Sequence, residues 1–202
     1  MTMLRTEQKE VGWSFGLQWV GVTIAGMVAG GMLALPIGYG LGEQVGNVLG
    51  EGVGFFVTGL LFGICLGGGI GLGQWVLLRP RLGRADLWAL TSAIGGAVGL
   101  GVAFPVLISI NAVNDPGPLA ELLLAAFFGL PVGIGQWFIL RGQVARSGWW
   151  VVICGAALAL GLLAGLQFDG EGREVLAFTI AGLGMGAGTG AGMVWLLREQ
   201  KE

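Results

Sequence analysis

Long apolar stretches alternate with short polar ones along the chain. About 20 apolar residues suffice for a helix to cross a bilayer core of about 30 Å. We expect membrane-spanning helices at about 13–36, 53–78, 87–110, 119–140, 149–168 and 175–197. The pattern therefore predicts an all-α membrane protein whose residues 1–202 form a single transmembrane domain with six spans.

The stretch 37–52 interrupts this pattern. It carries polar side chains between glycines, namely Tyr39, Glu43, Gln44, Asn47 and Glu51. This segment is too polar to lie against lipid tails. Periodicity allows either a helical extension of the first span or a short re-entrant segment. Its polar side chains are most simply a solvated loop, and the alternative is a vestibule lining or a contact with a partner.

One sequence ending recurs at the close of every second span. GLGQWVLLR at 71–79 returns as GIGQWFILR at 133–141 and, in altered form, as GAGMVWLLR at 190–198. Small residues precede each ending at every fourth position: Gly63, Gly67 and Gly71; Ala125, Gly129 and Gly133; Gly182, Gly186 and Gly190. Such stripes let neighbouring helix backbones approach closely.

The spans that open the repeats match as well. Small residues lie at equal offsets after Trp19, Trp88 and Trp150. We therefore expect three helical hairpins of parallel orientation, at about 13–80, 86–141 and 148–198. Repeats that enter and leave on one side are related by an axis along the membrane normal, so the prediction is a pseudo-threefold bundle.

Composition indicates a membrane environment, and the distribution of charge predicts the orientation of the chain in the membrane. The chain is 54% hydrophobic and 11% charged, with 42 glycines, no histidine and a formal net charge of -2, whereas a soluble domain is about 25% charged. The absence of a basic run argues against nucleic acid as a partner. Positive charge marks cytoplasmic loops. Of the 10 basic residues, all except Arg173 lie at the termini or in the loops after the even spans, so both termini are predicted to be cytoplasmic.

Two kinds of residue near the predicted cytoplasmic boundary have simple explanations. Arg79, Arg141 and Arg198 close the repeats and are candidates for a basic ring that binds phosphate, lipid headgroups or an acidic partner. Their simpler role is to anchor the helix ends in the interface. The tryptophans near the same boundary fit an interfacial aromatic belt: Trp19, Trp75, Trp88, Trp137, Trp149, Trp150 and Trp195.

Gln74 and Gln136 are the candidate ligand-binding residues inside the spans. They occupy the same repeat position, where the third copy has Met193. Polar residues in spans often join helices by hydrogen bonds, and the alternative is a site for a solute or a lipid headgroup between repeats. Cys65 and Cys154 lie at different predicted depths, so we expect no disulfide between them.

Catalytic patterns are missing from the sequence. The predicted spans hold no histidine and no carboxylate or lysine near the bilayer middle, whereas pumps and proton-coupled carriers usually place such groups there. Neither HExxH nor GxSxG nor a P-loop occurs. We therefore expect no enzymatic activity, no cofactor and no bound metal.

The repeated GxGQWxxLR ending, with tryptophans opening the following span, resembles that of a group of uncharacterised glycine-rich multi-span bacterial membrane proteins. The resemblance implies a multi-pass protein of the bacterial inner membrane. Our leading hypothesis is a structural or accessory subunit, or a helical module that binds lipid or an apolar cofactor. Its partners would be membrane lipids and other membrane-protein subunits. The alternative is a passive channel or facilitator for a small solute along the pseudo-threefold axis, with Gln74, Gln136 and the arginine ring near its inner mouth.

Overall fold

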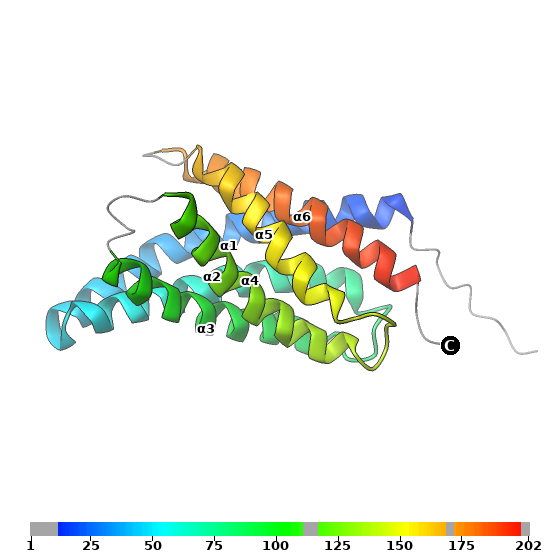
Figure 1. The fold of residues 1–202 in the computed structure, drawn as a ribbon, viewed down its shortest axis with the longest axis horizontal. Coiled ribbons are helices and arrows are strands. Elements are labelled where there is room, and N and C mark those ends of the chain that lie inside the picture. The colour runs from blue at the N-terminus through cyan, green and yellow to red at the C-terminus, as the bar shows by residue number, and fades with distance from the viewer. Residues whose placement is uncertain (1–11, 111–116, 169–171, 199–202) are drawn as a thin grey trace, which may run out of the picture.

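The computed structural model describes residues 12–110, 117–168 and 172–198. They form six helices (Figure 1): α1 (Trp13–Leu49), α2 (Glu51–Leu78), α3 (Leu87–Ser109), α4 (Pro118–Leu140), α5 (Trp149–Leu166) and α6 (Glu174–Arg198). All six are long and apolar enough to cross a membrane, which confirms the prediction of six spans. The charged leader, with Arg5 and Lys9, most of the predicted turn at 111–118, and Asp169, Glu171 and Lys201 lie outside the described residues.

The polar stretch 37–52 continues the first helix. Helix α1 has 37 residues and so is about 55 Å long at 1.5 Å per residue. Gly50, with φ of 100°, turns the chain directly into α2. A Cβ atom on Gly54 would lie 2.7 Å from the Cα atom of Gly46, so the two helices touch backbone to backbone. The helical extension is therefore correct and the re-entrant segment wrong, and this hairpin reaches beyond the other helices (Figure 1).

The six helices form a closed ring. Each packs against its neighbours in the chain, and α6 packs against α1. The small-residue stripes of α2, α4 and α6 lie at the contacts of these helices with α3, α5 and α1. A Cβ on Gly71 would be 2.7 Å from the Ser92 side chain, and one on Gly186 would be 3.0 Å from the Val20 Cα. The close helix approach that the stripes predict is thus present.

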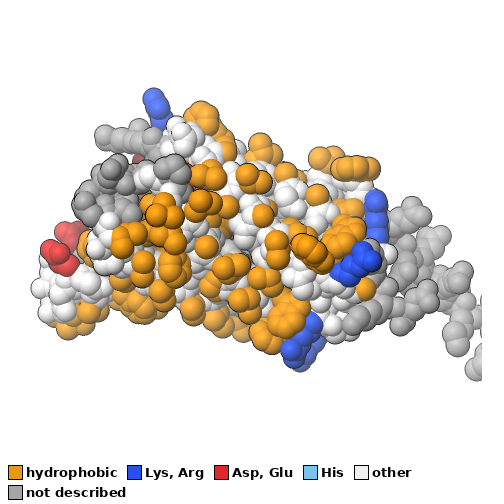
Figure 2. Space-filling model, viewed as in Figure 1, with side chains coloured by type: hydrophobic (Ala, Val, Ile, Leu, Met, Phe, Trp, Pro, Cys, Tyr) orange, Lys and Arg blue, Asp and Glu red, His pale blue; other side chains and the backbone are white. Residues whose placement is uncertain are grey.

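Charge is divided between the two ends of the bundle. Figure 2 shows basic side chains gathered at the end where α2, α4 and α6 finish, and acidic side chains at the opposite end. Arg173, just before α6, is at the acidic end. Much of the surface between the two ends is hydrophobic (Figure 2), as expected of a surface that faces lipid.

Candidate functional site

Three tryptophans meet in the middle of the helix ring. Trp19, Trp88 and Trp150 come from α1, α3 and α5 and are 0% exposed. Their ring centroids are 5.8 to 6.3 Å apart in all three pairs, within the range of favourable aromatic contacts. We call these residues the tryptophan cluster. The interfacial belt was therefore wrong for these three, because their rings pack on one another and not against lipid headgroups.

Gln74 and Gln136 hold two of the indoles in place. The Trp88 Nε1–H group donates to Gln74 Oε1 at 3.0 Å, and the Trp150 Nε1–H group donates to Gln136 Oε1 at 2.8 Å. A buried indole needs such an acceptor, because an unpaired buried donor costs about 1–3 kcal/mol. The glutamine positions thus explain how tryptophan can occupy the core.

The amide groups of both glutamines also reach the helix that precedes their own in the chain, α1 for Gln74 and α3 for Gln136. Gln74 Nε2 donates to Thr23 Oγ1 at 3.2 Å, and Gln136 Nε2 donates to Ser92 Oγ at 2.8 Å. The two glutamines are only 1% and 2% exposed. They therefore join helices, and their polar atoms are occupied by protein partners.

In the third copy of the repeated ending, a residue other than the glutamine equivalent accepts the hydrogen bond of the buried indole. Met193 is fully buried where the other copies have glutamine. Trp19 Nε1–H instead donates to Thr189 Oγ1 at 3.0 Å, one turn earlier on α6. Thr189 in turn donates to the Met185 carbonyl at 2.6 Å. Each of the three indole donors is therefore paired.

The repeat arginines lie apart from the glutamines. The Arg79 guanidinium is 5.6 Å from the Trp75 ring, and that of Arg141 is 4.7 Å from the Phe138 ring. Both pairs have cation–π geometry. Arg198 is exposed at the end of α6. The structure thus puts the two glutamines in the core and the three arginines at the surface, so the five candidates do not form one site.

The two cysteines do not form a covalent link. Cys65 and Cys154 are both free, which confirms the expected lack of a disulfide. Cys154 is buried, with its Sγ 3.6 Å from Gln136 Oε1. Within the described ranges, no group of three or more His, Cys, Asp or Glu residues is arranged to hold a metal ion.

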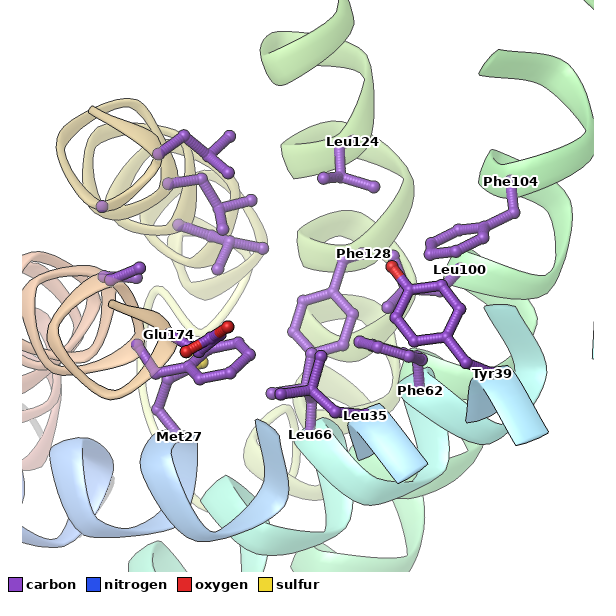
Figure 3. A pocket seen from close by; sticks show the side chains of 17 residues that line it. Met27, Leu35, Tyr39, Phe62, Leu66, Leu100, Phe104, Leu124, Phe128 and Glu174 are labelled. Atoms are coloured by element: carbon purple, nitrogen blue, oxygen red, sulfur yellow. The ribbon is translucent and has the colours of Figure 1, made fainter. Parts of the chain in front are cut away.

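An apolar cavity of about 250 Å³ lies inside the ring (Figure 3). It is partly open, and all six helices contribute to its walls. Its lining is hydrophobic apart from Tyr39 and Glu174: Met27, Leu35, Tyr39, Phe62, Leu66, Leu100, Phe104, Leu124, Phe128, Leu158, Leu162, Gly165, Leu166, Glu174, Ala177, Phe178 and Ala181. No pattern in the sequence indicates this cavity.

The tryptophan cluster lies between the cavity and the basic end of the bundle. Met27 and Leu158 line the cavity and lie eight residues after Trp19 and Trp150, which is about 12 Å along a helix. Leu82 and Val144, from the loops at the basic end, pack against the cluster from the other side. The interior is therefore packed at the basic end and hollow toward the acidic end.

The acidic end of the cavity carries its polar groups. Glu174 is the first residue of α6, and its Oε1 accepts the Gly172 N–H at 3.2 Å. The Tyr39 ring packs edge-on against Phe62 with centroids 5.2 Å apart. Of the polar side chains in the stretch 37–52, only Tyr39 is among the lining residues. One carboxylate and several aromatic rings thus share the space with aliphatic side chains.

These features define an all-helical fold of six helices, each long and apolar enough to cross a membrane, that enclose an apolar cavity. In comparisons with protein-family models, curated proteins and solved structures, no match to this chain was found. Inference about its function therefore starts from the geometry of the chain itself.

Proposed function

We propose that this is a non-enzymatic membrane protein whose bundle holds the apolar chain of a lipid in its central cavity. The observation that carries the proposal is the cavity itself. It is lined almost wholly by Leu, Phe, Met and Ala side chains and contacts all six helices. A smaller apolar cavity of about 150 Å³ stays free of water and binds benzene, so a cavity of about 250 Å³ suits an apolar ligand.

The energetic argument comes from the cost of empty space. Cavities in protein cores cost about 24 cal/mol per Å³, so leaving this cavity of about 250 Å³ empty would cost on the order of 6 kcal/mol. Lipid tails are as apolar as leucine, so the gain on binding comes from van der Waals contacts and not from leaving water. A chain from the surrounding bilayer provides those contacts without any need to desolvate polar groups.

We further infer that the bundle is pseudo-threefold, with both termini cytoplasmic, in the bacterial inner membrane. The support for the symmetry is the set of three stripes, each packed on the next hairpin, and the three mutually touching tryptophans. The support for the orientation is the gathering of basic side chains at one end of the bundle, following the positive-inside rule.

The same geometry argues against a passive channel along this axis. A channel needs a continuous polar path, whereas the tryptophan cluster fills the axis with three fully buried rings. Gln74 and Gln136, which would have lined the inner mouth, already bond to Trp88 and Trp150.

Mass spectrometry of the protein purified in a mild neutral detergent tests lipid binding. Leu162 lines the cavity, whereas Leu160, on the same helix, is 67% exposed and does not. We expect a lipid to stay bound to the natural chain and to Leu160→Trp, and to be lost from Leu162→Trp, because the larger side chain fills the cavity. Equal retention by both folded variants would refute the proposal.

A further inference from the structure

We propose that the cavity selects amphiphiles that carry a cationic ammonium head, with Glu174 as the recognising group. This inference rests on the proposed function and adds the chemical class of the ligand. Among the residues that line the cavity, Glu174 carries the one formal charge. Figure 3 shows its carboxylate directed from α6 into the space that the apolar side chains surround.

The carboxylate has capacity for a ligand. In the described part of the chain, its hydrogen bond comes from the Gly172 N–H to Oε1 at 3.2 Å. The side chain of the neighbouring Arg173 is exposed, and Glu174 is half-buried. A carboxylate offers about four lone-pair sites, so an ammonium group can bind while the Gly172 bond persists.

Aromatic rings around the carboxylate favour the same charge. Five of the lining side chains are aromatic: Tyr39, Phe62, Phe104, Phe128 and Phe178. The faces of such rings attract ammonium and quaternary ammonium groups, and aromatic cages recognise such ligands. An anionic head, such as that of a fatty acid, would instead meet a like charge at Glu174. The cavity therefore combines walls for an alkyl chain with a cation site at its acidic end.

Three probes of equal chain length distinguish the contribution of the head group to binding from that of the alkyl chain: dodecyltrimethylammonium, dodecanol and dodecanoate. Each is titrated into the full-length protein in maltoside micelles, and the bound fraction is measured by native mass spectrometry. Because Glu174 is partly exposed, we expect the ammonium probe to bind about two- to fivefold more tightly than the alcohol and the carboxylate most weakly.

The matched variants are Glu174→Gln and Glu121→Gln. Glu121 lies in the first turn of α4 and does not line the cavity. We expect Glu174→Gln to lose the preference for ammonium while still binding dodecanol, and Glu121→Gln to keep it. Equal affinities for the three heads, or equal effects of the two variants, would overturn the inference and leave lipid binding intact. If none of the probes binds, the proposed function itself is wrong.

A second arm identifies the source of the ammonium group. Nanodiscs of phosphatidylglycerol containing a small fraction of phosphatidylethanolamine are compared with nanodiscs of phosphatidylglycerol supplied with dodecylamine. Retention of phosphatidylethanolamine by the natural chain, and not by Glu174→Gln, assigns the site to a membrane lipid. Retention of dodecylamine alone assigns it to a free amphiphilic amine. Retention of neither overturns the inference.

Discussion

Replacing Gln136 with methionine tests whether the glutamines stabilise the tryptophan cluster. The structure supplies its own precedent, because Met193 is fully buried at the equivalent place in α6. The substitution should therefore keep the shape of the core and remove the acceptor of Trp150 and the donor to Ser92, both at 2.8 Å. Ser92 keeps its own bond to the Trp88 carbonyl, so the Trp150 N–H is the group left unpaired.

The expected loss of stability is about 1–2 kcal/mol. An unsatisfied buried donor costs about 1–3 kcal/mol, whereas interhelical hydrogen bonds in membranes average about 0.6 and reach about 1.7 kcal/mol. Gln136 should lie near the upper part of the membrane range, because both partners are fully buried and both distances are short. Gln74, whose bonds are 3.0 and 3.2 Å long, should lose less on the same change.

A double-mutant cycle with Trp150→Phe isolates the bond from the loss of packing. The free energy of unfolding is measured for the natural chain, both single variants and the double variant, by titrating sodium dodecyl sulfate into maltoside micelles and following far-ultraviolet circular dichroism. We expect a coupling energy of about 1 kcal/mol, since the second change removes the donor that the first left unpaired. Additivity within about 0.3–0.5 kcal/mol would refute the role given to Gln136.

Three further predictions concern packing, orientation and access. Gly63→Val should abolish the monodisperse peak in size-exclusion chromatography, because a Cβ atom at this position would clash with the Gly96 backbone. Gly21→Val should keep the peak, because nothing lies within 4 Å of a Cβ atom there. The same elution profile for both variants would contradict the close packing of α2 on α3. In a cysteine-free chain, an impermeant maleimide on intact cells should label Gly52→Cys and spare Gly142→Cys, and the reverse pattern would invert the topology. Cys154, 1% exposed, should react with N-ethylmaleimide only after sodium dodecyl sulfate unfolds the protein, and rapid labelling in maltoside would show an open core.

The six helices and their close contacts were predictable because each depends on a local pattern. Apolar length predicts a span, and a stripe such as Gly63, Gly67 and Gly71 predicts a close neighbour. The extension of α1 also had a signal. Small residues continue at every fourth position through Gly38, Gly42 and Gly46 into the polar stretch, and a re-entrant segment would not need that helical spacing.

The sequence pattern did not predict the tryptophan cluster, because a tryptophan near the end of a span is compatible both with the headgroup interface and with the bundle core. A tryptophan near the end of a span satisfies the belt rule whether its ring faces headgroups or the bundle core. The signal that distinguishes the two environments is the constant spacing between a glutamine and a tryptophan. Trp88 follows Gln74 by 14 residues, and Trp150 follows Gln136 by 14. An acceptor at a fixed distance from each indole indicates burial, because an interfacial indole finds its acceptor in water or lipid.

The cavity had no such signal. The volume of the cavity depends on how side chains from all six helices pack around the centre of the bundle, and no single stretch of the sequence determines that packing. Glu174 lies just outside the span predicted at about 175–197, because it is the first residue of α6. Its direction relative to the cavity becomes visible only when the helices are assembled.

Ring closure has a consequence for how the protein is made. The bond from Trp19 to Thr189 spans 170 positions of the chain, so it joins α1 to a helix that leaves the ribosome much later. Until α6 inserts, the indole donor of α1 lacks this acceptor, and the surface around Val20 and Ile24 that receives Gly186 and Gly182 stays uncovered. A nascent chain that stops before α6 therefore exposes an open seam to other membrane proteins and to quality-control proteases, and insertion of α6 covers that seam.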